Sequence, residues 1–323
     1  MNSVFPKKLV QGDEIRVLSP SSSIDRVGGF EENLIAKRRL ETLGFKVTFG
    51  DHILENDFLN SSSIDSRIAD IHAAFTDKNV KAVLTTIGGF NCNELLPHIN
   101  WDMIKENPKA FIGYSDTTSL HNAIRAKTGL ITFYGPCYSA FKMNELQEFQ
   151  TQEWLRAMTE KSYSLSASDV WTSDPWFDPS SPRHLKPNQW KVYNSGRACG
   201  IITGGNLQTY YLQAGTSFLP RVDSPIIFLE RAEGSSPEEF SRELAHVLQL
   251  HPDITGLVVG RFPTENEMSE KILRLIFDKY PVLKIIPVIY DLDFGHTQPI
   301  FTFPLGGLAE ISTEPIKIKI LKG

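Results

Sequence analysis

"KAFIGYSDTTSLHNAI", residues 109–124, joins an apolar run typical of a strand to a pattern typical of a helix. The strand pattern stops at Gly113, and Ser115 stands at the corner with Asp116 directly after it. Serine is a usual N-cap residue, so one interpretation of Ser115 is a helix cap. A serine on a tight strand-to-helix turn is also the arrangement of the nucleophile in α/β-hydrolases. This stretch alone leaves both interpretations open.

The alternation of short apolar runs and helical patterns continues on both sides of this corner. Strands that alternate with helices indicate βαβ units and a parallel sheet. We therefore expect an α/β fold with an N-terminal domain, residues 1–165, in which helices flank a parallel sheet. A smaller C-terminal α/β domain, residues 191–323, is expected to have a mixed or β-rich sheet.

Residues 166–190 interrupt this pattern with a segment rich in Ser, Pro and Asp that nevertheless contains several aromatic side chains. Among them are Trp171, Trp176 and Trp190. Long loops with aromatic residues are often binding loops or lids. The alternative is that the rings anchor the loop on the surface of the protein itself. Both interpretations remain open from the sequence.

The overall composition excludes several classes of function. The net charge of -5 comes without any long acidic or basic block, which argues against a nucleic acid partner. No run of 18 apolar residues appears, so neither a membrane-spanning helix nor a membrane partner is expected. The N-terminus has no apolar core of signal-peptide length, and the three cysteines are scattered without CxxC spacing. These features indicate a cytoplasmic protein.

A nucleophilic serine needs a base, and the base needs an orienting carboxylate. His296 stands in a Gly-His-Thr-Gln-Pro turn after a strand-like stretch, where it is either a base or a buried hydrogen-bonded histidine. Glu230 ends the strand-like stretch "PIIFLE". Functional side chains of α/β sheets gather at the carboxyl ends of the strands. We therefore expect Ser115, Glu230 and His296 to lie at the same edge of the fold.

An acyl-transfer site also needs donors for its oxyanion, usually backbone N–H groups. The amide of Asp116 is one candidate, and Gly88 or Gly89 supplies another, since a carbonyl can approach a backbone that lacks a side chain. The alternative is that the glycine pair forms only a tight turn. No HExxH or other ligand spacing appears, so we expect neither a metal ion nor a cofactor.

Six stretches of the chain, in this order, resemble the signatures of the LD-carboxypeptidase family of serine peptidases: "RVLSPSS", "IGGFNCNELLPHINWDMI", "FIGYSDTTSL", "GGNL", "FLERAEG" and "GHTQPIFTFPLGG". The resemblance implies a Ser-Glu-His triad at Ser115, Glu230 and His296. It also implies an oxyanion hole from the amides of Gly89 and Asp116, a cytoplasmic location and homodimers. Arg231 is a departure, because many relatives have Asp after the catalytic Glu.

Two branches of that family differ in substrate. One trims the terminal D-alanine from murein tetrapeptides, and the other, the microcin C self-immunity branch, cleaves the amide that joins an amino acid or peptide to a modified nucleotide. Ile87 favours the second branch, because the wall enzymes usually have Arg before the glycine pair. The tryptophan-bearing loop also resembles that branch, in which an aromatic ring stacks on the nucleobase. We therefore expect Trp171, Trp176 and Asn206 to contact substrate.

The sequence thus predicts a serine amide hydrolase with an acyl-enzyme mechanism and a small peptide or peptidyl-nucleotide substrate. Such an activity would serve detoxification or self-immunity. The first alternative is a murein tetrapeptide LD-carboxypeptidase of cell-wall recycling. The second alternative is a non-catalytic module that binds a nucleotide or peptide, against which the presence of all three triad residue types argues.

Overall fold

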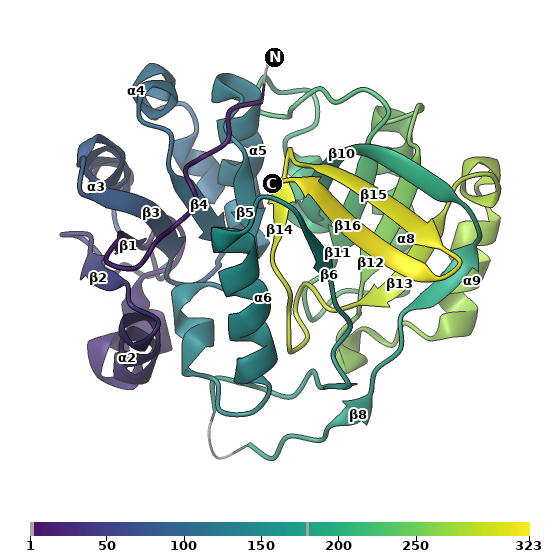
Figure 1. The fold of residues 1–323 in the computed structure, drawn as a ribbon, viewed down its shortest axis with the longest axis horizontal. Helices are drawn as coiled ribbons and strands as arrows, with labels where there is room; N and C mark the ends of the chain where they lie inside the picture. Colours follow the sequence, from purple (N-terminus) through teal and green to yellow (C-terminus); the bar gives the residue numbers. More distant parts are fainter. Residues whose placement is uncertain (1–2, 179–180) are drawn as a thin grey trace.

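The computed structural model describes residues 3–178 and 181–323, and two large sheets organise the chain. The first sheet has the strand order β14-β5-β4-β3-β1-β2, and the second has the order β6-β16-β15-β10-β11-β12-β13-β9. Figure 1 shows the first sheet in purple and blue on the left and the second in green and yellow on the right. The predicted α/β class, with a mostly parallel N-terminal sheet and a mixed C-terminal sheet, is confirmed.

Five of the six strands of the first sheet are parallel: β1 (Glu14–Leu18), β2 (Lys46–Phe49), β3 (Val80–Thr85), β4 (Ala110–Gly113) and β5 (Thr132–Tyr134). Their side chains are mostly buried, as expected for strands with helices on both faces. The helices of this half are α1 (Gly29–Glu32), α2 (Leu34–Thr42), α3 (Ile64–Thr76), α4 (Trp101–Glu106), α5 (Thr118–Thr128) and α6 (Gln147–Thr159). Short 3₁₀ turns are η1 (Ile24–Val27), η2 (Cys92–Leu95), η3 (Ser115–Thr117) and η4 (Tyr138–Lys142).

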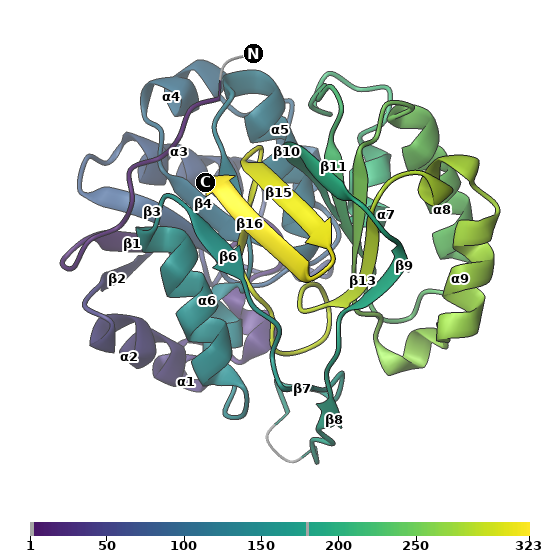
Figure 2. The same cartoon turned by 45° about the vertical axis from the view of Figure 1, so that its right-hand side comes forward.

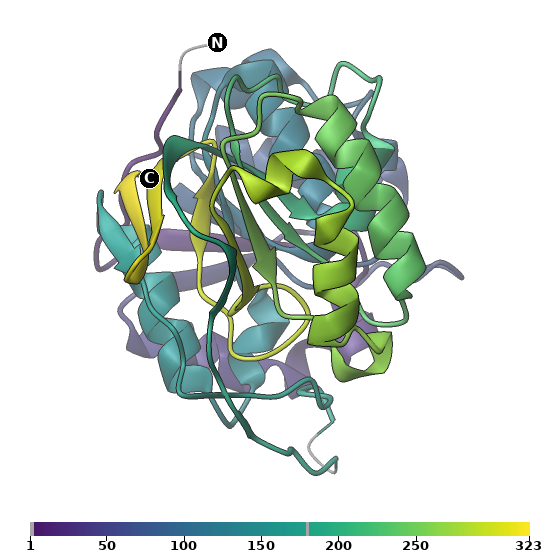
Figure 3. The same ribbon diagram turned by 90° about the vertical axis from the view of Figure 1, so that its right-hand side faces the viewer.

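The second sheet has a parallel centre of β10 (Arg197–Asn206), β11 (Ile226–Glu230), β12 (Gly256–Gly260) and β13 (Val288–Leu292). Antiparallel strands extend it on both sides: β9 (Lys191–Asn194), β15 (Leu308–Thr313), β16 (Ile316–Lys322) and β6 (Tyr163–Leu165). Figure 3 shows α8 (Pro237–Leu250) and α9 (Glu270–Asp278) on the outer side of this sheet. The remaining elements are α7 (Leu207–Leu212), η5 (Thr264–Asn266) and η6 (Pro281–Lys284).

Two strands cross between the halves of the chain. β14 (Phe303–Leu305), from the C-terminal half, pairs with β5 of the first sheet. β6 lies in the range predicted for the N-terminal domain, yet it pairs with β16 of the second sheet, as Figure 2 shows. Each sheet is therefore completed by the other half of the chain, while the predicted boundaries at 165 and 191 stay a prediction.

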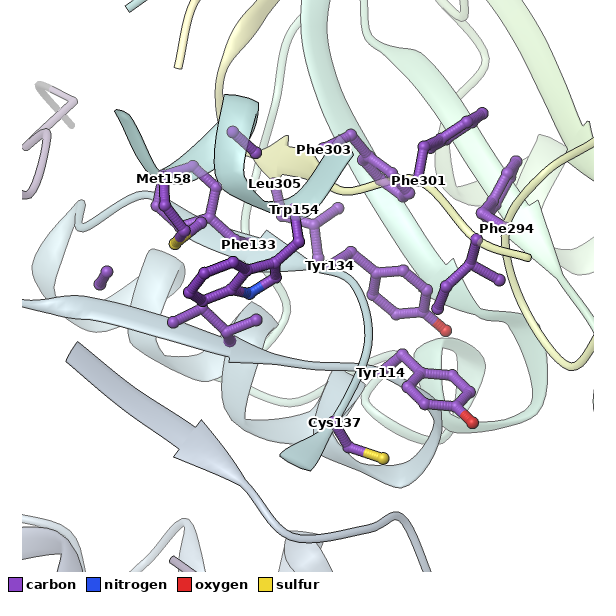
Figure 4. Packing of buried hydrophobic residues seen from close by; sticks show 14 of the residues in the cluster. Tyr114, Phe133, Tyr134, Cys137, Trp154, Met158, Phe294, Phe301, Phe303 and Leu305 are labelled. Atoms are coloured by element: carbon purple, nitrogen blue, oxygen red, sulfur yellow. The ribbon is translucent and has the colours of Figure 1, made fainter. Parts of the chain in front are cut away.

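One hydrophobic cluster joins the two sheets. It contains side chains of both, such as Phe133 on β5 and Phe228 on β11. Figure 4 shows Trp154 of α6 within this cluster. The ring of Trp154 packs edge-on against Phe45 and Phe141, with centroid distances of 5.7 and 5.4 Å. Because this core is shared, the strand ends of one sheet are held at fixed positions relative to those of the other.

The predicted aromatic loop is partly ordered into a two-stranded ribbon, β7 (Val170–Trp171) and β8 (Lys186–Pro187). Both ends of the loop are tied to the buried carboxylate of Asp293, which accepts hydrogen bonds from Ser168 Oγ and from Trp190 Nε1, each at 2.7 Å. Asp293 lies shortly before His296 in the chain. The base of the loop and the histidine-bearing segment therefore share one anchor.

Among the residues that the structure describes, no helix is both long enough and apolar enough to cross a bilayer. The most amphipathic helices instead bury one face on the second sheet, as Leu273, Ile276 and Phe277 of α9 do.

Arg231 follows β11 directly, and its side chain contacts α8. Its guanidinium is 1% exposed and pairs with Glu243 through Nη1 and with Glu239 through Nη2 at 3.2 Å. The positive charge that the sequence places next to Glu230 is therefore engaged by carboxylates of α8.

Removal of one partner from a buried ion pair leaves an uncompensated charge. We expect Glu243→Ala to lower the free energy of unfolding by about 3 kcal/mol, the low end of the usual range because Glu239 still pairs with Arg231. Gln249→Ala, on an exposed position of the same helix, should change it by no more than about 0.5 kcal/mol. Urea denaturation compares the two variants, and equal stabilities would contradict a structural role for this pair.

Candidate active site

Ser115 occupies a strained corner between β4 and η3. Its backbone has φ = 65°, in the left-handed region that a residue other than glycine rarely adopts. Such a conformation costs about 1–3 kcal/mol and persists only where the surrounding structure holds it. The N-cap of α5 is Thr117, and no side-chain cap bond is present there. The interpretation of Ser115 as a helix cap is therefore wrong.

The structure brings the three predicted triad side chains together. Ser115 Oγ lies 3.0 Å from His296 Nε2, and His296 Nδ1 lies 2.7 Å from Glu230 Oε2. The Glu230 side chain is completely buried, while that of His296 retains 11% exposure. Both distances are within hydrogen-bonding range, so a proton can pass from the hydroxyl to the imidazole without rearrangement.

Gly295 is the reason that His296 can reach Glu230. It has φ = 100°, and a side chain there would begin 2.5 Å from Glu230 Oε2. Any residue larger than glycine would therefore displace either the carboxylate or the turn that carries the histidine.

The other carboxylate oxygen of Glu230 is also fully engaged. Glu230 Oε1 accepts hydrogen bonds from Tyr134 Oη at 2.6 Å and from Asn206 Nδ2 at 3.0 Å. Asn206 is 2% exposed and also caps α7, since its Oδ1 accepts from the backbone N–H of Thr209 at 3.1 Å. The predicted contact of Asn206 with substrate stays a prediction, and its contacts in the structure lie beneath the triad.

Burial and neighbouring charges shift the pKa values of Glu230 and His296 in opposite directions. Burial raises the pKa of Glu230, but attraction to His296 and the hydrogen bonds from His296, Tyr134 and Asn206 outweigh it, so this pKa is lowered. Burial lowers the pKa of His296, but the charge and hydrogen bond of Glu230, helped by the charge of Glu233, raise it above the ordinary value of 6.5. The carboxylate therefore stays ionised, and the histidine is a stronger base than a free imidazole.

The glycine pair lies against the nucleophile. A side chain on Gly88 would begin 2.9 Å from Ser115 Oγ, and one on Gly89 would begin 2.2 Å from Ser21 Oγ. The Asp116 carboxylate accepts from Ser21 Oγ at 2.5 Å and from the backbone N–H of Cys92 at 2.9 Å, which ties these loops together.

The predicted oxyanion donors stay a prediction. Within residues 3–178 and 181–323, neither Gly89 nor Asp116 has an acceptor for its backbone N–H. Both groups are thus uncommitted donors on segments that border the nucleophile.

The two predicted tryptophans lie in different surroundings. Trp176 borders a small cavity together with Tyr114, Gly295 and Thr297, next to the triad histidine. Its ring also packs against the shared hydrophobic core.

Trp171 instead contacts two cations on the wall of a separate cavity of about 610 Å³. Lys186 Nζ is 4.9 Å from the ring centroid, and the guanidinium of Arg261 is 4.8 Å from it. The contact with Lys186 lies within the β7–β8 ribbon, and the contact with Arg261, directly after β12, holds the ribbon against the second sheet.

Sequence reasoning missed Tyr134, which contacts both Glu230 and Ser115. The available signal was its position at the carboxyl end of β5, the same edge that carries Ser115 after β4.

No group of three or more His, Cys, Asp or Glu side chains among the described residues has the spacing to hold a metal ion.

Several known proteins are similar to this chain in sequence or in fold. An MccF-like protein from Bacillus anthracis, of known structure, is 42% identical, with a TM-score of 0.96 over 99% of this chain and 100% of that chain. The microcin C7 self-immunity protein MccF of Escherichia coli is 30% identical over 83% of this chain and 81% of its own length. A structure of MccF in complex with aspartyl sulfamoyl adenosine has a TM-score of 0.90 over 99% of both chains.

A probable murein peptide carboxypeptidase of Bacillus subtilis is 28% identical over 95% of this chain and 91% of that protein. The LD-carboxypeptidase N-terminal domain matches residues 15–135, and the LD-carboxypeptidase C-terminal domain matches residues 199–311. Each domain contains its share of the site, Ser115 in the first and Glu230 with His296 in the second. The chain belongs to the LD-carboxypeptidase family.

Proposed function

We propose that this protein is a serine hydrolase that cleaves the amide between an amino acid or peptide and a modified nucleotide. The observation that carries the chemistry is the relay from Ser115 through His296 to Glu230, with distances of 3.0 and 2.7 Å. The positive φ of Ser115 supports the same role, because it presents the hydroxyl on a strained elbow.

In the proposed mechanism His296 Nε2 takes the proton of Ser115 Oγ as the oxygen attacks the scissile carbonyl. Glu230 holds the imidazole through Nδ1–H and stabilises the imidazolium. The backbone N–H groups of Gly89 and Asp116 donate to the oxyanion of the tetrahedral intermediate. His296 then gives its proton to the departing nitrogen, which leaves an ester on Ser115. A water molecule that loses its proton to His296 hydrolyses this ester and restores the free hydroxyl.

The proposal that the substrate contains a nucleotide is supported by similarity to known proteins and by the aromatic loop. MccF has been solved with an aminoacyl sulfamoyl nucleoside, and the chain is more similar to an MccF-like protein than to the murein peptide carboxypeptidase. Ile87 supports the same branch, since it packs against the hydrophobic core where an Arg is usual in wall enzymes. Trp176 is the tryptophan beside the triad, so we assign base stacking to Trp176 and loop anchoring to Trp171.

The alternative substrate is a murein tetrapeptide, which the similarity to the murein peptide carboxypeptidase favours. Comparison of kcat/KM for an aspartyl sulfamoyl adenosine and for a murein tetrapeptide decides between the two. A preference for the nucleoside supports the proposal, and turnover of the tetrapeptide alone assigns the protein to wall recycling. Turnover of neither would favour a non-catalytic binding module. The homodimer and the cytoplasmic location stay predictions.

Ser115→Ala should leave the fold intact and lower kcat by about 10⁴- to 10⁶-fold, because no other hydroxyl occupies the elbow. The matched control is Ser119→Ala on α5, whose buried hydroxyl makes no hydrogen bond with the described residues. Steady-state kinetics and thermal melts are compared for both variants. If Ser115→Ala retains more than about a tenth of the wild-type rate, Ser115 is not the nucleophile.

The raised pKa of His296 predicts the acid limb of the pH–rate profile. Only neutral His296 accepts the serine proton, so kcat/KM should fall as the pH drops through a value above 6.5. Glu230→Gln removes the negative charge that raises this pKa and should move the limb to lower pH while it lowers the rate. His98→Gln, at an exposed position, should leave the limb in place. A Glu230→Gln limb that stays at the wild-type pH would contradict the proposed pairing.

Trp176→Ala should raise KM for the adenylated substrate, because loss of base stacking, worth about 1–3 kcal/mol, corresponds to a roughly 5- to 150-fold loss of binding. The effect on a murein tetrapeptide, which has no base, should be much smaller. Trp171→Ala should instead lower the melting temperature and affect both substrates alike, since the ring pins the ribbon. Equal losses on both substrates in Trp176→Ala would remove the assignment of stacking to Trp176.

A further inference from the structure

We propose that Tyr134 is a positioning residue. Its hydroxyl bonds to the backbone of Ser115 and to the carboxylate of Glu230, and so fixes the position of the nucleophile relative to the triad carboxylate. The inference deepens the proposed serine hydrolase mechanism and rests on it. Tyr134 Oη lies 3.1 Å from the backbone nitrogen of Ser115 and 2.6 Å from Glu230 Oε1.

The direction of both hydrogen bonds follows from chemistry alone. The backbone N–H of Ser115 can only donate, and an ionised carboxylate can only accept. The single hydroxyl of Tyr134 must therefore accept from Ser115 and donate to Glu230. Rotation of the hydroxyl to any other partner would break the short, charge-assisted bond to Glu230 and leave a buried carboxylate with one donor fewer.

Tyr134 also spans the junction of the two sheets. It lies on β5 of the first sheet, in register with Gly113 of β4, two residues before the nucleophile. Glu230 ends β11 of the second sheet. One hydroxyl thus fixes the distance between a backbone atom of one half of the molecule and a side chain of the other.

The end of β10 leaves room for the tyrosine ring. Gly205 has φ = 113°, and a side chain there would begin 3.1 Å from the Tyr134 ring and 2.9 Å from Thr118. The "GGNL" stretch therefore lets β10 pass close to Tyr134 and then supplies Asn206, the third donor to Glu230. Gly205 and Asn206 therefore both serve the contact between Tyr134 and Glu230.

Packing leaves the ring no alternative position. Tyr134 is completely buried, and its ring centroid lies 5.3 Å from that of Phe303 and 5.9 Å from that of His121. Figure 4 shows the hydroxyls of Tyr134 and Tyr114 pointing to the same side, away from Trp154.

Several ionisable groups surround this network besides the triad itself. Burial lowers the pKa of His121 to about 3, so it contributes no charge near neutral pH. Burial, followed by the charge of Glu230, raises the pKa of Tyr134 well above its ordinary value, so the hydroxyl keeps its proton. The other ionisable groups that act on the network are Tyr114, Cys137 and Glu233.

The test uses a fluorophosphonate, which reacts with an activated serine and needs no knowledge of the substrate. Serine oxygen bonds to phosphorus, fluoride leaves, and the serine proton passes to His296. Tyr134→Phe removes only the hydroxyl, so the Ser115 N–H loses its acceptor and the labelling rate should fall about tenfold or more. Glu230 loses a donor and attracts the imidazolium more strongly, so the acid limb should move up by roughly 0.5 to 1 pH unit.

A second variant places 3-fluorotyrosine at position 134. This residue adds only one small fluorine atom beside the hydroxyl and can make both hydrogen bonds, but it is a stronger donor, so it should move the acid limb to lower pH. The opposite direction of the two shifts is a result that a purely structural role would not produce. Tyr138→Phe is the matched control, since it loses one buried hydrogen bond, from Tyr138 Oη to the Asn33 carbonyl at 3.0 Å. It should lower the melting temperature without a change in rate or limb.

The outcomes separate this inference from the proposed function. Failure of the wild-type protein to label at Ser115 would overturn the serine mechanism and the positioning role with it. If the wild type labels and both Tyr134 variants keep its rate and its acid limb, the positioning role alone is wrong. Shifts of both variants in the same direction would also overturn it, because they would indicate general loosening of the site.

Discussion

An ionised carboxylate without solvent contact lies where the two sheets meet, and the organisation of the site follows from the need to stabilise it. An isolated buried charge is unfavourable by several kcal/mol or more, so it persists only with partners for its oxygens. Glu230 has three donors, from Tyr134 of the first sheet, from Asn206 of the second, and from His296 on the segment that joins β13 to β14. The same contacts that stabilise the charge also orient the histidine, so stability and catalytic geometry have one origin.

This requirement explains features that otherwise look unrelated. The shared hydrophobic core and the exchanged strands β6 and β14 hold the two halves rigidly enough for hydrogen bonds between them to keep fixed lengths. Gly205 and Gly295 remove side chains where the backbone must pass beside Tyr134 and Glu230. The strained backbone of Ser115 is held by its N–H bond to Tyr134, so the strain is maintained by the same network.

The substrate contact that we propose lies in a different part of the molecule. The aromatic loop is tied to Asp293 at its base, while Trp176 lies near the triad and Trp171 is held by Arg261 and Lys186. A loop that is anchored at its ends and variable in between can change specificity without disturbing the triad.

The sequence alone predicted the α/β class from its alternating strand and helix patterns. It predicted the grouping of Ser115, Glu230 and His296 from their strand-end positions together with the resemblance to the LD-carboxypeptidase family. That Ser115 and Glu230 follow strands of two different sheets was decided only by the tertiary structure. Local pattern could not separate the elbow from a helix cap at Ser115, since both use a serine at the start of a helix and differ only in backbone conformation. Tyr134 and the engagement of Arg231 by α8 depended entirely on tertiary structure. Their partners lie on other elements, Glu230 for the tyrosine and Glu243 for the arginine, and no periodicity within one segment encodes a contact between two sheets or between a strand end and a helix. Which half of the chain completes each sheet was likewise decided only by the packing of the shared core, because an edge strand carries the same residue pattern whichever sheet it joins.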